Sequence, residues 1–123
     1  MPAYSQTVPT SLAGQLVSLN NLSSSPMNNV TGASSGKIWI IEGDNTSSEA
    51  IPVYLKIADA ATATVGVTNP AFTLYIPPGK VSCYVFPEGH SYSSGVSVWS
   101  STNQADFASS QIPSGFLAKI IAS

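Results

Sequence analysis

Short stretches in which apolar and polar residues alternate with a period of two constrain the fold of this chain more than any other feature. No long stretch has the 3.6-residue spacing of an amphipathic helix, and Gly, Pro, Asn and Ser separate the alternating stretches. The sequence therefore predicts an all-β protein of antiparallel strands, arranged as a β-sandwich or jelly roll. One turn of helix is expected within residues 103–110.

Five of the predicted strands have a core face that alternation assigns, with every second residue toward the core. These residues are Val53, Leu55 and Ile57 within 51–58; Phe72, Leu74 and Ile76 within 71–76; Val81, Cys83 and Val85 within 80–86; Val96 and Val98 within 95–101; and Phe116, Ala118 and Ile120 within 115–123. Lys56 and Trp99 would point away from this core. Residues 37–43 and 115–123 are apolar on both faces, which indicates a central strand or contact with another chain.

Proline and glycine mark the corners between two of these strands. Pro77, Pro78 and Gly79 are typical of a tight turn, because proline presets φ and glycine accepts a positive φ. We therefore expect residues 74–90 to form a hairpin with a second corner at residues 86–89.

The first 36 residues differ from the rest of the chain, because small polar residues dominate them and only residues 14–19 look like a strand. Residues 1–36 are expected to be an extended N-terminal arm, or a strand that orders against a partner. Residues 37–123 are expected to be the β domain. The first residues have no basic segment followed by an apolar one, so the expectation is folding in a cytoplasm without a signal peptide.

The scarcity of charge excludes several classes of function. Charged residues make up 8% of the chain, against about 25% in an average protein, and the four basic residues are scattered lysines. Nucleic acids and anionic membranes are bound by clustered positive charge, so neither is an expected partner. A single cysteine cannot form an intramolecular disulfide, which leaves stability to packing and neighbouring subunits.

Groups able to perform chemistry are few. His90 is expected in an exposed loop and Cys83 in the core, so a Cys–His pair has no support, and a hydrolase that combines His90 with a nearby serine lacks the supporting motif. Asp44, Asn45 and Glu49 do not match the spacing of a calcium loop. No catalytic residue, metal site or cofactor is predicted, and the expectation is that the protein is not an enzyme.

Five aromatic residues stand at strand positions opposite to the predicted core face. They are Trp39, Tyr54, Tyr75, Tyr84 and Trp99. Outward aromatic rings on a β scaffold can anchor a protein interface or stack on sugars. The alternative is that both faces of the sheets are partly buried, in which case these rings belong to the fold.

The order of corners and strands over residues 51–99 resembles a small β-sandwich module in the structural proteins of tailed bacteriophage virions. The segments that carry the resemblance are P-V-Y-L-K-I at 52–57, A-D-A-A-T-A-T-V-G at 58–66, N-P-A-F-T-L-Y-I-P-P-G at 69–79 and F-P-E-G at 86–89. None of them is a catalytic signature. The resemblance implies a virion component, present in many copies, without enzymatic activity.

Two functions follow as expectations from this resemblance. The first is a capsid decoration or cement protein that associates as a homotrimer and binds the major capsid protein on the outer surface of the head, after assembly in the host cytoplasm. The second is a tail or fibre protein that binds a glycan of the host surface through exposed aromatic residues. The resemblance assigns no functional residue, because the shared pattern is one of packing.

Overall fold

The structure is a computed structural model that describes residues 15–20, 22, 25–48, 50–102 and 116–123. Its strands are β1 (Gln15–Leu19), β2 (Gly36–Asp44), β3 (Val53–Ala58), β4 (Phe72–Ile76), β5 (Val81–Tyr92), β6 (Ser97–Ser101) and β7 (Leu117–Ala122). The expected all-β class is confirmed, and the described residues contain no helix, hence none that could cross a membrane. The turn of helix expected at residues 103–110 lies outside the described residues.

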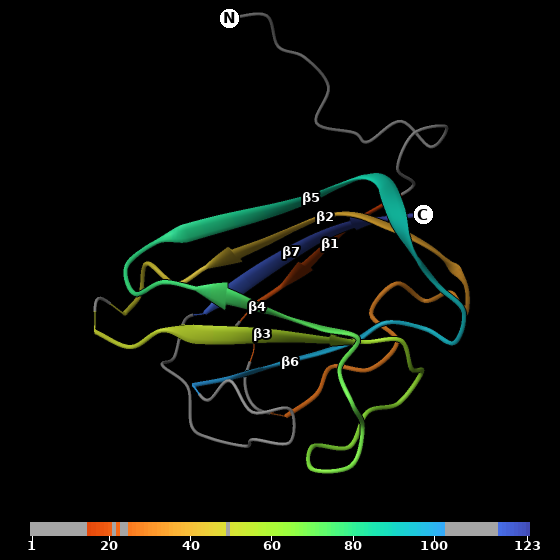
Figure 1. Cartoon of the computed structure of the whole chain (residues 1–123), viewed down its shortest axis with the longest axis horizontal. Helices are drawn as coiled ribbons and strands as arrows, with labels where there is room; N and C mark the ends of the chain where they lie inside the picture. Colours follow the sequence, from red (N-terminus) through yellow and green to blue (C-terminus); the bar gives the residue numbers. More distant parts are fainter. Residues whose placement is uncertain (1–14, 21, 23–24, 49, 103–115) are drawn as a thin grey trace, which may run out of the picture.

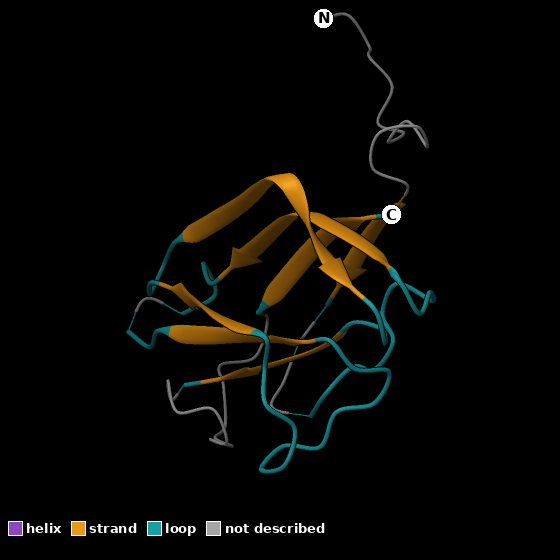
Figure 2. Cartoon of the chain, turned by 45° about the vertical axis from the view of Figure 1, so that its right-hand side comes forward, coloured by secondary structure: helices purple, strands orange, loops and turns teal. Residues whose placement is uncertain are grey.

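The strands form two antiparallel sheets that lie one above the other (Figure 1). The four-stranded sheet has the order β1-β7-β2-β5, and the three-stranded sheet has the order β4-β3-β6. Figure 2 shows the two layers from the side, with most of the long loops below the three-stranded sheet. The space between the layers holds one hydrophobic core to which both sheets contribute.

Four of the five predicted core faces are confirmed. In β3, β6 and β7 the expected apolar residues are buried, and in β4 Leu74 and Ile76 are buried while Phe72 packs against the core. In β3 and β4 the Val, Leu and Ile residues all lie on one face, and that face is the buried one.

The core face of β5 was predicted wrongly, because the strand is turned over relative to the expectation. Tyr84 and Phe86 pack against the core, whereas Val81, Cys83 and Val85 are exposed. Both faces of this strand are apolar, so alternation alone does not decide between them. The face with the two aromatic rings removes more apolar area from water, and that face is the buried one.

Residues 74–90 are also not a hairpin, because β4 and β5 lie in different sheets. The turn at Pro77–Lys80 carries the chain from one layer to the other, and Gly79 has the expected positive φ of 69°. Asn45, fully buried at the end of β2, holds this crossing: its Nδ2 donates to the carbonyl oxygens of Ile51 at 2.8 Å and Pro77 at 3.3 Å. The crossing between layers thus depends on a buried amide.

The second expected corner, at residues 86–89, is a bulge inside β5. Ile38 pairs with His90 and Ile40 pairs with Val85, so four residues of β5 stand opposite one residue of β2. Gly89 has a φ of 76° in this bulge, a conformation that a residue with a Cβ rarely adopts. The bulge lets β5 bend sharply around the end of the four-stranded sheet (Figure 2).

The outer face of the three-stranded sheet is covered where Lys56 and Trp99 stand opposite each other. Both side chains are fully buried, which corrects the expectation that they point to the surface. Trp99 packs against Ala63 and Val65 of the loop that follows β3. The alternation of these strands was predicted correctly, but their second face is buried as well.

The described residues between 15 and 36, a segment expected to be an arm, belong to the two-sheet fold. β1 pairs with β7 along its whole length, as expected for the strand-like piece at residues 14–19. Leu19 and Leu22 lie in the core, and Met27 forms a bridge with Val98 of β6. Residues 1–14 lie outside the described residues.

Candidate functional site

The five aromatic residues predicted as an interface do not form one surface. Trp99 is fully buried, and Tyr84 packs against the core while its hydroxyl donates to the carbonyl oxygen of Tyr75 at 2.6 Å. Neither of them is therefore an outward anchor. Trp39 lies on β2 in the four-stranded sheet, whereas Tyr54 and Tyr75 lie together on the other sheet.

Tyr54 and Tyr75 are the two predicted interface residues that the structure brings together. They are directly paired across β3 and β4, on the side opposite to the buried Leu55 and Leu74. Their ring centroids are 5.3 Å apart at an interplanar angle of 49°, and Tyr75 is 45% exposed. A tilted aromatic pair on an outer sheet face offers a rigid, mostly apolar surface with polar edges.

Trp39 stands opposite the bulge of β5. The Nζ of Lys37 lies 5.7 Å from the centre of its ring, within the range of a cation–π contact. A Cβ on Gly89 would meet the side chains of both residues, which explains why the bulge has a glycine there. Trp39 is half-buried in this packing, and its Nε1 finds no acceptor among the described residues.

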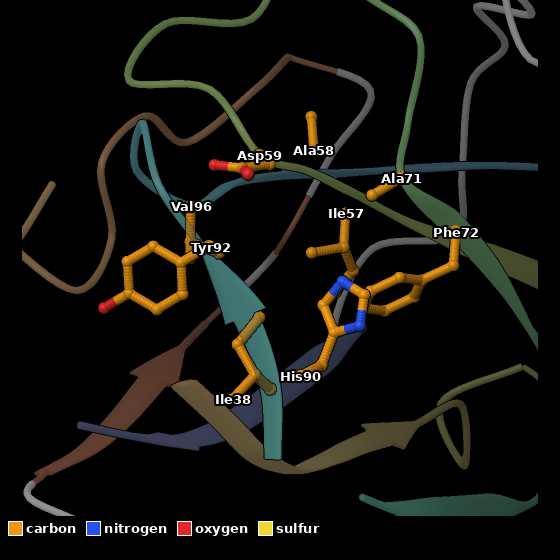
Figure 3. Close-up of a pocket in the computed structure, with 9 residues that line it drawn as sticks. All are labelled: Ile38, Ile57, Ala58, Asp59, Ala71, Phe72, His90, Tyr92 and Val96. Atoms are coloured by element: carbon orange, nitrogen blue, oxygen red, sulfur yellow. The ribbon is translucent and has the colours of Figure 1, made fainter. Parts of the chain in front are cut away.

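His90 is not in an exposed loop, as the sequence had indicated, but in β5 between two aromatic rings. It meets Phe72 edge-on with centroids 4.9 Å apart, and Phe86 at 5.7 Å. His90 and Phe72 line a pocket that also contains Asp59 and Tyr92 (Figure 3). The pocket has a volume of about 10 Å³, room for at most one water molecule.

Cys83 lies on the outer face of the four-stranded sheet and is exposed, which corrects the expectation that it is buried. Phe72 and Phe86, which enclose His90, both pack against the core side. Cys83 and His90 are therefore on opposite sides of β5, and the geometry does not support a Cys–His pair.

Two carboxylates, those of Asp44 and Asp59, accept hydrogen bonds from neighbouring turns or loops. The Thr46 hydroxyl and N–H donate to Asp44 Oδ1 at 2.6 and 2.9 Å and lower the pKa of Asp44. Burial alone would raise the pKa of Asp59, but N–H groups of Ser93, Ser94 and Gly95 outweigh it and lower that pKa. Among the described residues, no cluster of three His, Cys, Asp or Glu side chains could hold a metal ion.

Sequence reasoning missed an apolar row on the outer face of the four-stranded sheet. Its members, one from each strand, are Leu16, Ile121, Ile40 and Val85. The two-faced character of residues 37–43 and 115–123 pointed toward it, since Ile40 and Ile121 are the outward residues of those strands. Val85 was missed because the core face of β5 was assigned the wrong way round.

No protein-family model, curated protein or solved structure matches this chain.

Proposed function

We propose that the chain is a jelly roll, a finer assignment than two antiparallel sheets. The support comes from residues 27–30, which run beside β6: Met27 and Val98 exchange N–H···O bonds of 2.8 and 2.9 Å, and Val30 N–H donates to Val96 O at 2.8 Å. Counted as a second strand of eight, this segment gives sheet orders 1-8-3-6 and 2-7-4-5. That is the order of a jelly roll, an architecture that recurs in viral capsid and lectin domains.

On this architecture we propose a structural protein of a tailed-bacteriophage virion, which decorates the outer surface of the head and stabilises it. The resemblance of residues 51–99 to such modules supports this role, and the fold alone does not decide it. The observation that carries the proposal is the Tyr54–Tyr75 pair on the outer face of the three-stranded sheet, where Tyr75 is 45% exposed. The proposed partner is the major capsid protein, and no enzymatic activity, nucleic acid or membrane is part of the proposal.

Decoration requires many copies, each of which needs only a modest affinity because the lattice repeats the site. The pair would seat at junctions between capsid subunits and bridge them. The number of copies in the free protein is a separate matter: the homotrimer expected from the sequence rests on the resemblance alone.

The test is to mix the purified protein with heads that lack it, and separately with tails that lack it, and to image both by electron cryomicroscopy. Regular density on the head lattice is expected, and Tyr75→Ala should abolish most of it. Val67→Ala is the matched control, because Val67 is 72% exposed in the loop between β3 and β4, at the end of these strands opposite to the Tyr54–Tyr75 pair. Density on neither particle would contradict the virion role.

A second candidate is binding of a host-surface glycan by a tail or fibre protein, which the same tyrosine pair favours because sugar rings stack on aromatic faces. Density confined to the tail, together with saturable binding of the isolated protein to an oligosaccharide array that Tyr75→Ala removes, would select this role over decoration.

A further inference from the structure

The apolar row crosses every strand of the four-stranded sheet at one level. Leu16 pairs with Ile121, Ile121 with Ile40, and Ile40 with Val85, so the four side chains follow each other across β1, β7, β2 and β5. Leu16 is 51% exposed and Val85 is 60% exposed. In a chain whose surface is built mainly from small polar residues, a continuous apolar row of this kind indicates a contact surface.

The next outward level of the same sheet carries charge at its centre. Ser18 pairs with Lys119, Lys119 with Glu42, and Glu42 with Cys83. The two charged residues thus stand on the two middle strands, β7 and β2, and the two uncharged residues stand on the edge strands. This level is polar, and its opposite charges are placed symmetrically about the line that separates β7 from β2.

We propose that this face binds the same face of a second copy, about a two-fold axis that lies in the contact plane and runs between β7 and β2 parallel to the strands. The rotation exchanges β7 with β2 and β1 with β5. It places Ile121 against Ile40 of the second copy, and Leu16 against Val85. Lys119 then faces Glu42 of the second copy, and the reverse contact occurs at the same time.

Charge complementarity argues for a second copy as the occupant. An isologous contact must be self-complementary, and here one rotation pairs the apolar row with itself and Lys119 with Glu42, while Asp44, two residues further along β2, faces Leu117. An unrelated partner would have to supply both a matching apolar row and two charges opposite in sign to Lys119 and Glu42. The inference concerns association between copies, and it stands whether or not the protein decorates a phage head.

The size of the face predicts a weak dimer. Four strands spaced by about 4.8 Å and the nine residues of β2 at about 3.3 Å each give a face of roughly 19 by 30 Å. Two such faces bury about 1,100 Å² in total, at the lower limit of specific interfaces. A dissociation constant in the micromolar range is therefore expected.

The test is sedimentation equilibrium of the full chain over roughly 1 to 200 μM, a range that brackets such a constant. The wild type should be a monomer–dimer mixture, and Val85→Asp should weaken the dimer at least tenfold. Val67→Asp is the matched control, since it places the same charge on an exposed valine away from the sheet. Circular dichroism checks that each variant is folded, and Leu16→Asp replaces Val85→Asp if that variant is not.

A charge exchange tests the two-fold axis itself. Lys119→Glu and Glu42→Lys should each weaken the homodimer, because each creates like charges both within one copy and across the contact. An equimolar mixture of the two variants should dimerise again, since every contact between unlike copies is then between opposite charges. Repulsion within a single copy would persist in the mixture, so recovery is specific to the contact between copies.

The remaining outcomes overturn the proposal. The wild type could be a monomer at all concentrations, whether the face is covered by residues 1–14 or left bare, or it could be a trimer. Val67→Asp could weaken the dimer as much as Val85→Asp, or the mixture of the two charge variants could fail to dimerise.

Discussion

The buried amide of Asn45 provides the sharpest test of how the chain crosses between the two sheets. Its Nδ2 donates to the carbonyl oxygens of Ile51 and Pro77, and a contact of 3.5 Å to Ile76 O is too long to count as a full bond. Asn45→Ala removes both bonds, each worth about 1 kcal/mol, and leaves the half-buried Pro77 carbonyl without its partner. The Oδ1 of Asn45 finds no donor among the described residues, so its removal offsets part of this loss.

The expected net loss is about 2–3 kcal/mol of the free energy of unfolding. With an unfolding entropy of about 2.1 cal/mol/K per residue over 123 residues, this loss lowers Tm by about 8–12 °C. Urea denaturation at 25 °C and calorimetry measure the two quantities. Asn69→Ala is the control, because Asn69 is exposed in the loop before β4 and should lose less than about 0.5 kcal/mol.

The isosteric variant Asn45→Asp separates hydrogen bonding from packing. It points a carboxylate at carbonyl oxygens in a buried site, which raises the pKa of the new group in the folded state. The cost of burying the carboxylate is then fully present above the raised folded pKa, decreases as the pH falls through that pKa, and is absent below the unfolded pKa of about 3.9. If Asn45→Ala cost no more than Asn69→Ala, or if the Asp variant showed no relief in acid, the amide would not hold the crossing.

Three further predictions concern single residues. Gly79→Ala should lose about 1–2 kcal/mol in urea denaturation, because Gly79 has a φ of 69°, and Gly79→Asn should lose less. Asp59→Ala should lower Tm at pH 7, because the lowered folded pKa of Asp59 means that its carboxylate stabilises the fold. This stabilisation is present above the unfolded pKa of about 3.9 and disappears as the pH falls through the folded pKa, so the Tm values of the wild type and the variant should converge in acid. Cys83 should react with a maleimide at the rate of a free thiol when the protein is dilute, and protection at low concentration would contradict its exposure.

The contrast between the two faces of a strand decided the outcome in β3 and in β5. In β3 the alternate residues Val53, Leu55 and Ile57 are all aliphatic and all buried, so the period of two gave the right core face. In β5 both sets of alternate residues are apolar. Tyr84 and Phe86 have the larger apolar area, and their face is the buried one. The alternation pattern does not compare the areas of the two faces.

The candidate surfaces were harder to predict, because they depend on which outward faces are covered. Trp99 and Tyr75 both point away from the core, yet the loop after β3 buries the first and leaves the second 45% exposed. Sequence alternation assigns a residue to a face, and only the path of distant loops decides whether that face meets solvent. The apolar row required in addition the register of four strands, which is fixed by pairings between residues far apart in the chain.

The two proposed surfaces lie on opposite sides of the molecule, and this arrangement leads to a last prediction. A dimer formed through the four-stranded sheets would present its two Tyr54–Tyr75 pairs in opposite directions, so one flat lattice could engage only one of them and would gain no avidity from the dimer. Val85→Asp should therefore bind heads with unchanged affinity per copy. The wild type, in contrast, should link separate heads at concentrations where it dimerises, and light scattering should rise for the wild type and Val67→Asp but not for Val85→Asp. Equal scattering by all three proteins would mean that the apolar row does not join the copies.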